Sequence, residues 1–360
     1  MSLSLKHRRL APSHCSSCRT LSTLSRPYRF HIAASWAGKP PDPRVKRVKS
    51  SFPPNSSILK WKDDQLARLH TSTWGTDPGE DFFYVQEMRE QSGAYAEADK
   101  GVSVGVADGV GGWVDSGVDP SLFSQALMFH AHRYSKHGWA GEPEIDPMQE
   151  YEEREQVEGW EMTPKECLEL SYDAVLRERA VSAGSSTACL LNLNASSGLL
   201  RSANLGDSGF SIIRSSQVFY RQEPQTHFFN CPKQLTKLPR GSRRYSSSAV
   251  DAPGDAELYE TRLRSGDIVI VYTDGLSDNV FPSELVQICS LVSRQMEGTK
   301  SDDEQAQTMA NRIVEYAKMC MHNRKRVSPF ERAAAKEDMF FRGGKVDDVT
   351  VIVALVRETA

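Results

Sequence analysis

The pattern of apolar and polar positions divides the chain into short strands and amphipathic helices. Runs rich in β-branched and aromatic residues predict buried strands in four places, at 81–87, 102–107, 267–273 and 349–356. Apolar residues at helical spacing predict helices in four places, at about 119–137, 163–176, 282–298 and 303–322. Most other apolar segments come in pairs across short turns, and 257–263 is expected to pair in this way with 267–273. The chain is therefore predicted to be an α+β protein, with antiparallel sheets and helices packed outside them.

The predicted strand at 102–107 ends abruptly at Asp108, and three glycines follow within four positions. A carboxylate at the end of a buried strand is costly unless it is paired or holds a metal ion. Glycines at such a place let a ligand approach the backbone closely. An Asp-Gly pair is also typical of a hairpin turn, but residues 110–120 resemble a loop rather than the second strand that a hairpin needs. This segment alone leaves both interpretations open.

Carboxylates flank the other three predicted strands in the same way. They are Glu80, Asp81, Asp274, Asp347 and Asp348. A buried cluster of hard oxygen ligands is typical of a Mg²⁺ or Mn²⁺ site rather than a zinc or copper site. The recurrence of the pattern therefore favours a metal site centred on Asp108.

Composition narrows the class of protein. The length of 360 residues suits one large domain or two small ones, and a net charge of −3 gives no argument for a nucleic-acid partner. No apolar run approaches the ~20 residues that a membrane-spanning helix needs, so no integral membrane segment is expected. The seven cysteines are irregularly spaced, which predicts reduced thiols in an intracellular compartment.

The N-terminal segment is rich in arginine and serine, and no acidic residue occurs before Asp42. This composition is typical of an organellar transit peptide, and the apolar core of a secretory signal is missing. We therefore expect residues 1–41 to be a mitochondrial presequence, residues 42–57 to be a linker and residues 58–360 to be one folded domain. A basic tail without a targeting role is the alternative. Within the domain, the strongly acidic residues 141–161 are expected to form an exposed insertion.

Six short segments resemble, in the same order, motifs of the metal-dependent serine/threonine phosphatases of the PP2C family. They lie at 79–81, 107–113, 185–188, 204–208, 273–279 and 347–351. The resemblance covers about residues 74–356 and is strongest to the mitochondrial PTC7-type branch of that family. It implies a four-layer α-β-β-α sandwich with two central antiparallel sheets and a site for two Mn²⁺ or Mg²⁺ ions at one end.

The resemblance also assigns the site residues, position by position. It implies direct metal ligands at Asp108, the Gly109 carbonyl, Asp274 and Asp347, and contacts through metal-bound waters at Glu80 and Asp81. Asp347 rather than Asp348 is the expected ligand, because the usual family pair at this place is Asp-Asn. The segment 206–209 also matches the nucleophile motif of serine proteases, but no matching histidine segment occurs, so Asp207 is expected to shape a turn near the metal site.

The function implied is that of a protein-serine/threonine phosphatase, in which a hydroxide bound to both ions attacks the phosphorus of a phosphoprotein substrate. Mitochondrial matrix proteins are the expected substrates. Val110 replaces the family's usual histidine, and no basic residue stands near Thr76, where many members carry a phosphate-binding arginine. These two departures leave the general acid and the substrate-binding residues unassigned. The alternative is a pseudophosphatase, a binding module of the same fold; retention of the metal carboxylates favours the enzyme.

Overall fold

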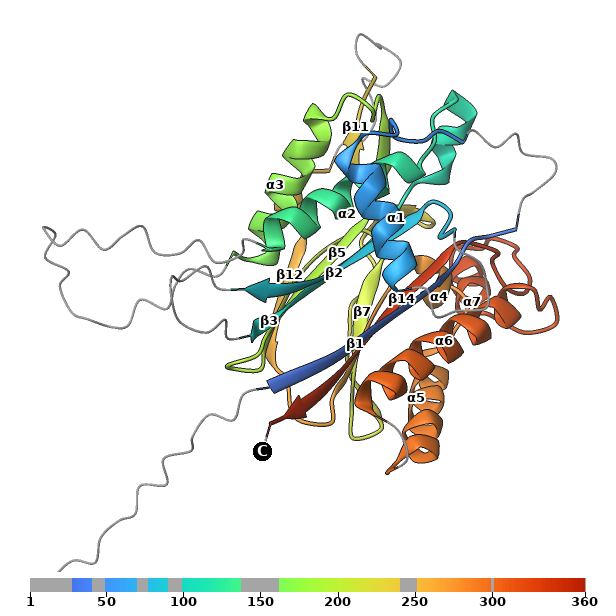
Figure 1. The fold of residues 1–360 in the computed structure, drawn as a ribbon. Coiled ribbons are helices and arrows are strands. Elements are labelled where there is room, and N and C mark those ends of the chain that lie inside the picture. Colours follow the sequence, from blue (N-terminus) through green and yellow to red (C-terminus); the bar gives the residue numbers. More distant parts are fainter. Residues whose placement is uncertain are drawn as a thin grey trace, which may run out of the picture.

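The computed structural model describes residues 28–40, 49–69, 77–89, 99–136, 162–239, 251–298 and 301–359. Within them, two five-stranded antiparallel sheets lie at the centre of the molecule (Figure 1). The first sheet has the order β1 (Tyr28–Ala37), β14 (Val349–Glu358), β13 (Ile268–Tyr272), β7 (Gly209–Arg214) and β8 (Gln217–Arg221). The second has the order β12 (Glu257–Arg262), β6 (Leu199–Leu205), β5 (Ala188–Asn194), β3 (Asp99–Asp108) and β2 (Asp81–Arg89). Two short pairs join β10 (Cys231–Pro232) to β9 (Thr226–Phe228) and β11 (Leu235–Lys237) to β4 (Gly184–Ser186).

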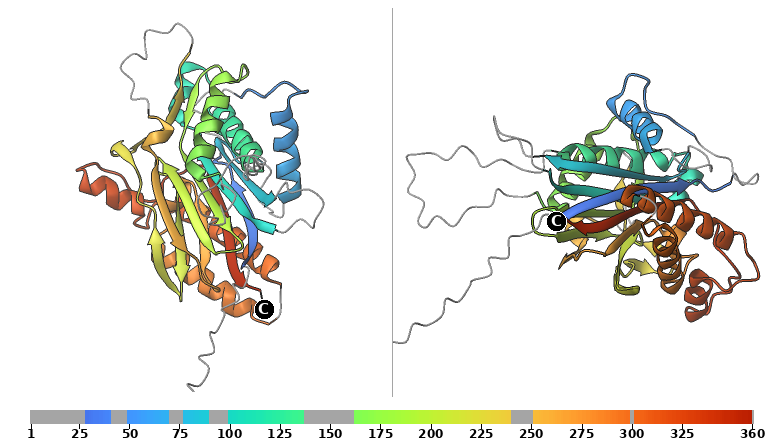
Figure 2. Two further views of the ribbon diagram at one scale, coloured as in Figure 1. Left: turned by 90° about the vertical axis from the view of Figure 1, so that its left-hand side faces the viewer. Right: turned by 60° about the horizontal axis from the view of Figure 1, so that its bottom comes forward.

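Helices cover the outer face of each sheet (Figures 1 and 2). The second sheet is covered by α1 (Ser57–Leu69), α2 (Ser121–Lys136) and α3 (Pro164–Arg177). The first is covered by α5 (Pro282–Met296) and α6 (Asp302–Met321), with the shorter α4 (Asp274–Ser277) and α7 (Pro329–Lys336) beside them. No helix in the described parts of the chain is both long and apolar enough to cross a membrane.

The strands alternate their side chains between two apolar layers. Phe83 lies in the cluster between the two sheets, whereas its neighbour Phe82 points to the opposite face and packs with Leu127 of α2. In the other sheet Ile352 points inward, while Val353 packs with the α6 side of that sheet. Helices, sheet, sheet and helices thus follow one another, and the predicted four-layer α-β-β-α sandwich is confirmed.

The N-terminal boundary predicted for the folded domain, at residue 58, is wrong. Strand β1 lies inside the segment predicted as a presequence, yet it pairs with β14 along its whole length. Its Trp36 is 1% exposed, and the Trp36 ring centroid lies 4.9 Å from that of Phe83. One side chain of β1 contacts α6: His31 Nδ1 lies 2.8 Å from the Asp303 carboxylate in the first turn of that helix.

The predicted pairing of 257–263 with 267–273 is also wrong. β12 pairs with β6 in one sheet and β13 pairs with β7 and β14 in the other, so the turn between them carries the chain across the sandwich. The two strands differ in environment, since β12 is largely exposed and β13 is fully buried. The predicted acidic insertion at 141–161 lies outside the described residues, which resume at Met162.

Candidate active site

The acidic residues predicted from the strand ends meet at one end of the sandwich. Asp81 opens β2 and lies directly opposite Asp108, which closes the neighbouring β3. Asp274 follows β13 after a single residue, and Asp348 directly precedes β14, the strand that pairs with β13. Because antiparallel neighbours place the end of one strand beside the start of the next, four distant segments of the chain bring their carboxylates together.

Two of these acidic side chains form, together with Asp207, a group that could hold a metal ion. Asp108, Asp207 and Asp274 each offer a carboxylate oxygen, and the three oxygens lie within 4.8 Å of one another. Asp207 comes from the turn between β6 and β7, so the structure gives it more than the turn-shaping role predicted from the sequence. Its sequence signal is the same as that of the other sites, an acidic residue shortly after a buried strand.

The chemistry of this cluster fits a divalent cation. The Oδ1 atoms of Asp81, Asp207 and Asp274 are buried and have no hydrogen-bond partner within the described residues. Burial first, and then neighbouring carboxylates, raise the pKa of Asp81, Asp108 and Asp207 well above the usual value. Buried oxygens without partners are costly, and hard oxygen ligands are those that Mg²⁺ and Mn²⁺ prefer. Cations would stabilise all of these groups in their ionised form.

Two lysines, neither of them predicted, lie among the carboxylates. The Nζ atom of Lys345 lies 2.6 Å from Asp274 Oδ2 and 2.7 Å from Asp278 Oδ2. It also lies 3.3 Å from Asp347 Oδ2. Burial alone would raise the pKa of Asp274, but the Lys345 ammonium lowers it below the usual value. Lys345 therefore acts as a built-in counterion at the end of β13.

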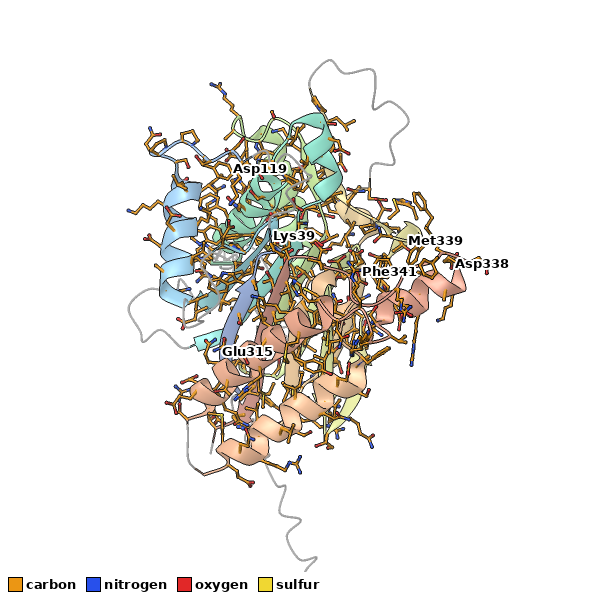
Figure 3. All side chains as sticks on the ribbon, turned by 90° about the vertical axis from the view of Figure 1, so that its right-hand side faces the viewer. Lys39, Asp119, Glu315, Asp338, Met339 and Phe341 are labelled. Atoms are coloured by element: carbon orange, nitrogen blue, oxygen red, sulfur yellow. The ribbon has the colours of Figure 1, made fainter. Side chains whose placement is uncertain are left out.

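Lys39, which is labelled in Figure 3, follows the end of β1 and is the second lysine of the cluster. Its Nζ atom lies 2.7 Å from Glu80 Oε2, 3.1 Å from Asp347 Oδ1 and 3.4 Å from Asp348 Oδ2. Burial lowers the pKa of Lys39, but these three carboxylates outweigh it and raise the pKa above its usual range. Asp347 thus contacts both lysines and lies outside the cluster of three formed by Asp108, Asp207 and Asp274.

Asp348 joins the ends of two strands. Its Oδ1 accepts the backbone N–H of Lys39 at 2.6 Å, and its Oδ2 accepts that of Glu80 at 2.9 Å. The residue Asp348 is 2% exposed. Gly79 has φ of 78°, and a Cβ atom there would collide with the Asp348 carboxylate. This contact explains why glycine precedes the Glu-Asp pair.

The other sequence motifs brace Asp108 and the loop after it. Thr187 Oγ1 accepts the backbone N–H of Asp108 at 3.2 Å, and the Thr187 N–H donates to the Asp108 carbonyl at 3.0 Å. Ser208 Oγ lies 2.7 Å from the same threonine hydroxyl. At Gly109 a Cβ atom would lie 2.7 Å from the Pro120 carbonyl oxygen, so glycine is needed there for close packing. The serine and threonine motifs are therefore structural supports.

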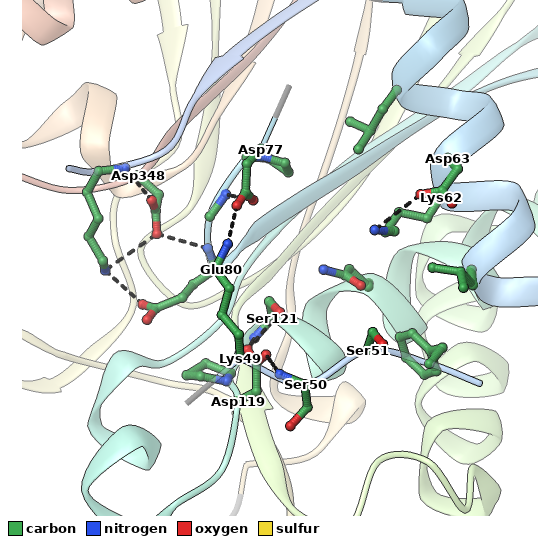
Figure 4. Close-up of a pocket in the computed structure, with 18 of the residues that line it drawn as sticks. Lys49, Ser50, Ser51, Lys62, Asp63, Asp77, Glu80, Asp119, Ser121 and Asp348 are labelled. Atoms are coloured by element: carbon green, nitrogen blue, oxygen red, sulfur yellow. Dashed lines mark hydrogen bonds and ion pairs between the residues drawn. The ribbon is translucent and has the colours of Figure 1, made fainter. Parts of the chain in front are cut away.

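A cavity of about 490 Å³ opens beside the cluster, between α1 and the start of α2 (Figure 4). Phe52 and Leu66 form part of its apolar wall. Glu80 and Asp348 lie at one end of it, as Figure 4 shows, and Lys39 also lines it. The cavity therefore gives a route from the surface to the Lys39 side of the carboxylates.

Comparison with known proteins gives the chain its family. No protein-family model matches it. The chain is 39% identical over 274 residues to the protein phosphatase PTC7 homolog fig of Drosophila grimshawi, which covers 76% of this chain and 80% of that protein. It is 36% identical over 255 residues to the human protein phosphatase PTC7 homolog, covering 71% and 75% of the two chains. The chain belongs to the PTC7 protein phosphatase family.

The fold of this PTC7-family phosphatase agrees with that assignment. The solved structure of the photosystem II phosphatase PBCP superimposes with a TM-score of 0.59 at 24% identity, covering 91% of this chain and 98% of the other. The predicted resemblance to PP2C phosphatases and their PTC7-type branch is thus confirmed, and the protein is an enzyme of the protein phosphatase class. In this family member the side chain of Val110 cannot titrate. Lys39 supplies a positive charge beside Glu80, which the residues near Thr76 do not.

Proposed function

We propose that this phosphatase is metal-dependent, binds two Mn²⁺ or Mg²⁺ ions around Asp108, and hydrolyses phosphoserine and phosphothreonine in proteins. One observation carries the proposal: carboxylate oxygens of Asp108, Asp207 and Asp274 converge within 4.8 Å in a chain of the PTC7 family. Oxygen donors of this kind suit Mg²⁺ and Mn²⁺.

The residues divide into those that would hold the ions and those that position them. The proposed direct ligands are Asp108, the Gly109 carbonyl, Asp274 and Asp347, and Glu80 and Asp81 act through water; Asp207 joins them on the evidence of its position. Bound divalent ions neutralise phosphate charge and lower the pKa of water, which is the chemistry that such a site supplies. Thr273 Oγ1 donates to Asp81 Oδ2 at 2.7 Å and so fixes that carboxylate beside Asp108.

The decisive experiment is phosphate release from a phosphothreonine peptide by the full-length chain. We expect release with Mn²⁺ or Mg²⁺ and none with EDTA. Circular dichroism of the same sample shows whether the protein is folded. Folded protein that releases no phosphate with either metal would refute the proposal and support the binding-module alternative.

We further propose that the enzyme acts on phosphoproteins of the mitochondrial matrix. The acid-free, arginine-rich composition before Tyr28 supports an import signal, and the position of β1 requires that any cleavage occur at or before Tyr28. A fluorescent reporter fused to residues 1–50 should enter mitochondria, and the imported full chain should begin at or before Tyr28. Diffuse cytosolic fluorescence, or a mature N-terminus within β1, would contradict this.

A further inference from the structure

The cavity between α1 and the start of α2 carries more negative than positive charge. Five carboxylates line it against three lysines: Asp63, Asp77, Glu80, Asp119 and Asp348, with Lys39, Lys49 and Lys62. Each lysine already forms an ion pair with one of these carboxylates, Lys39 with Glu80, Lys49 with Asp77 and Lys62 with Asp63. The lysines of the cavity therefore leave part of its negative charge unbalanced.

Asp119 holds a carboxylate charge in this lining without a cation from the described residues beside it. Its oxygens accept the backbone N–H of Ser50 at 2.7 Å, the backbone N–H of Ser121 at 3.0 Å and the Ser121 hydroxyl at 2.7 Å (Figure 4). The residue is 7% exposed, and it also lines a second cavity of about 260 Å³. Neutral donors thus fix the position of a buried charge where two cavities meet, and a cation that reaches it would be bound favourably.

The same cavity has an apolar wall. Phe52, Leu59 and Leu66 line it, together with Val114 from the segment after Asp108. Arginine and lysine side chains combine a long apolar stem with a charged head, and they pack the stem on apolar surface while the head meets a polar group. A cavity of about 490 Å³ that offers an apolar wall and an unbalanced carboxylate matches both parts of such a side chain.

The cavity also adjoins the proposed reaction centre. Glu80 and Asp348 lie at one end of it. Pro120, which follows Asp119, packs against the turn after Asp108, where a Cβ atom on Gly109 would lie 2.7 Å from the Pro120 carbonyl oxygen. A substrate chain whose phosphorylated residue reaches the carboxylate cluster therefore brings its neighbouring residues to this cavity.

We propose that this cavity is a specificity subsite, which binds an arginine or lysine side chain close to the phosphorylated residue of the substrate. The inference rests on the proposed function, since it names the class of phosphoprotein that the same site prefers. The basic head donates hydrogen bonds to the Asp119 carboxylate, and its stem packs on Phe52 and Leu66. Phosphoproteins with a basic residue near the phosphorylated one are the preferred substrates.

The test measures kcat/KM on phosphothreonine peptides that differ at one residue, with full-length protein and Mn²⁺. Arginine is placed in turn at each position near the phosphothreonine and is exchanged for citrulline, which has a similar shape but no charge. The ratio of the two values is compared among the wild type, Asp119→Asn and Asp63→Asn. Asp173→Asn is the matched control, because Asp173 is an exposed residue of α3 outside the cavity. Thermal unfolding monitors the fold of each variant.

At one position we expect the wild type to prefer arginine over citrulline by roughly tenfold, the size of a charge-assisted hydrogen bond. Asp119→Asn should lose most of this preference and Asp63→Asn part of it, whereas Asp173→Asn should keep it. Equal rates for arginine and citrulline at every position in the wild type would overturn the inference. So would a full preference in folded Asp119→Asn or, if that variant does not fold, in Asp63→Asn. A wild-type protein that releases phosphate from no peptide would instead refute the proposed function.

Discussion

The Nζ atom of Lys345 lies 2.6 Å from Oδ2 of Asp274, the carboxylate that follows β13. The same ammonium contacts Asp278 and Asp347, so it neutralises one corner of the acidic cluster. Asp274 Oδ1 is buried and has no hydrogen-bond partner within the described residues. Asp274 thus pairs with the Lys345 ammonium through one carboxylate oxygen, and its second oxygen is available to a ligand.

Replacing Lys345 by methionine should therefore tighten Mn²⁺ binding and destabilise the metal-free protein. Removing a positive charge within 3 Å or so of the carboxylates strengthens their attraction for a cation, by at least about tenfold in affinity. Calorimetry with Mn²⁺ and thermal unfolding in EDTA measure the two effects. Lys345→Arg retains the charge and is the control. Weaker Mn²⁺ binding in Lys345→Met would show that the lysine helps to build the ion site.

Asp347 and Asp348 are adjacent, but their variants should behave differently. Asp347→Asn should weaken Mn²⁺ binding about tenfold or more, because an ionised oxygen is lost from the proposed ligand set. Asp348→Asn should lower the free energy of unfolding by about 1–3 kcal/mol, because an amide nitrogen cannot accept the second backbone N–H. Calorimetry and urea unfolding of both variants test this. Weaker Mn²⁺ binding in Asp348→Asn together with lower stability in Asp347→Asn would contradict the choice of Asp347 as the ligand.

Truncation before and after β1 should separate folded from unfolded protein. A chain starting at Tyr28 keeps the β1–β14 ladder, whereas a chain starting at residue 42 exposes the edge of β14 and removes Trp36 from the core. Losing a buried tryptophan alone costs about 3–5 kcal/mol, so the shorter chain should unfold or aggregate. Solubility and thermal unfolding of the two proteins measure this. Equal stability would mean that β1 is dispensable.

His132 should make stability depend on pH. Burial first, and then the positive charges of Arg68 and Lys136, lower the pKa of His132 to about 4 from the ordinary 6.5. Between these two pKa values His132 is protonated in the unfolded chain but neutral in the folded protein. The free energy of unfolding therefore falls as the pH drops from 6.5 towards 4, by up to about 3 kcal/mol.

The control for this effect is His132→Phe, since the ring lies 5.2 Å from Trp61 in an aromatic cluster that another aromatic side chain suits. Urea unfolding of both proteins at pH 7.5 and pH 5 gives the difference that belongs to His132. All other titrating groups contribute equally to both proteins. An identical loss of stability on acidification in the variant would contradict the assignment.

The sequence allowed prediction of those site residues that lie at the end of a buried strand. Asp108 and Asp274 could be found because a carboxylate at the end of an apolar run is locally anomalous, whatever the fold. β13 and most of β14 are likewise runs of apolar residues, so strands buried on both faces were predictable, whereas the two-sheet sandwich was expected from the resemblance to the PP2C family.

Other parts depend on contacts that no local pattern encodes. Lys39 and Lys345 are ordinary surface residues in sequence and acquire their role only when the fold places them among acidic side chains. β1 was not predicted because it lies within the acid-free, arginine- and serine-rich segment whose composition is typical of an import signal. From the sequence, Asp207 is expected only to shape a turn near the metal site. The distances between carboxylate oxygens are what place it in one cluster with Asp108.

The most direct test of the central claim is phosphate release from a phosphothreonine peptide by wild-type protein and by Asp108→Asn, each with Mn²⁺ and with EDTA. We expect metal-dependent release by the wild type, and a loss of at least about 100-fold in the variant, because the site loses its central charge. Thermal unfolding should show that Asp108→Asn remains folded. Comparable Mn²⁺-dependent release by a folded Asp108→Asn protein would contradict the account.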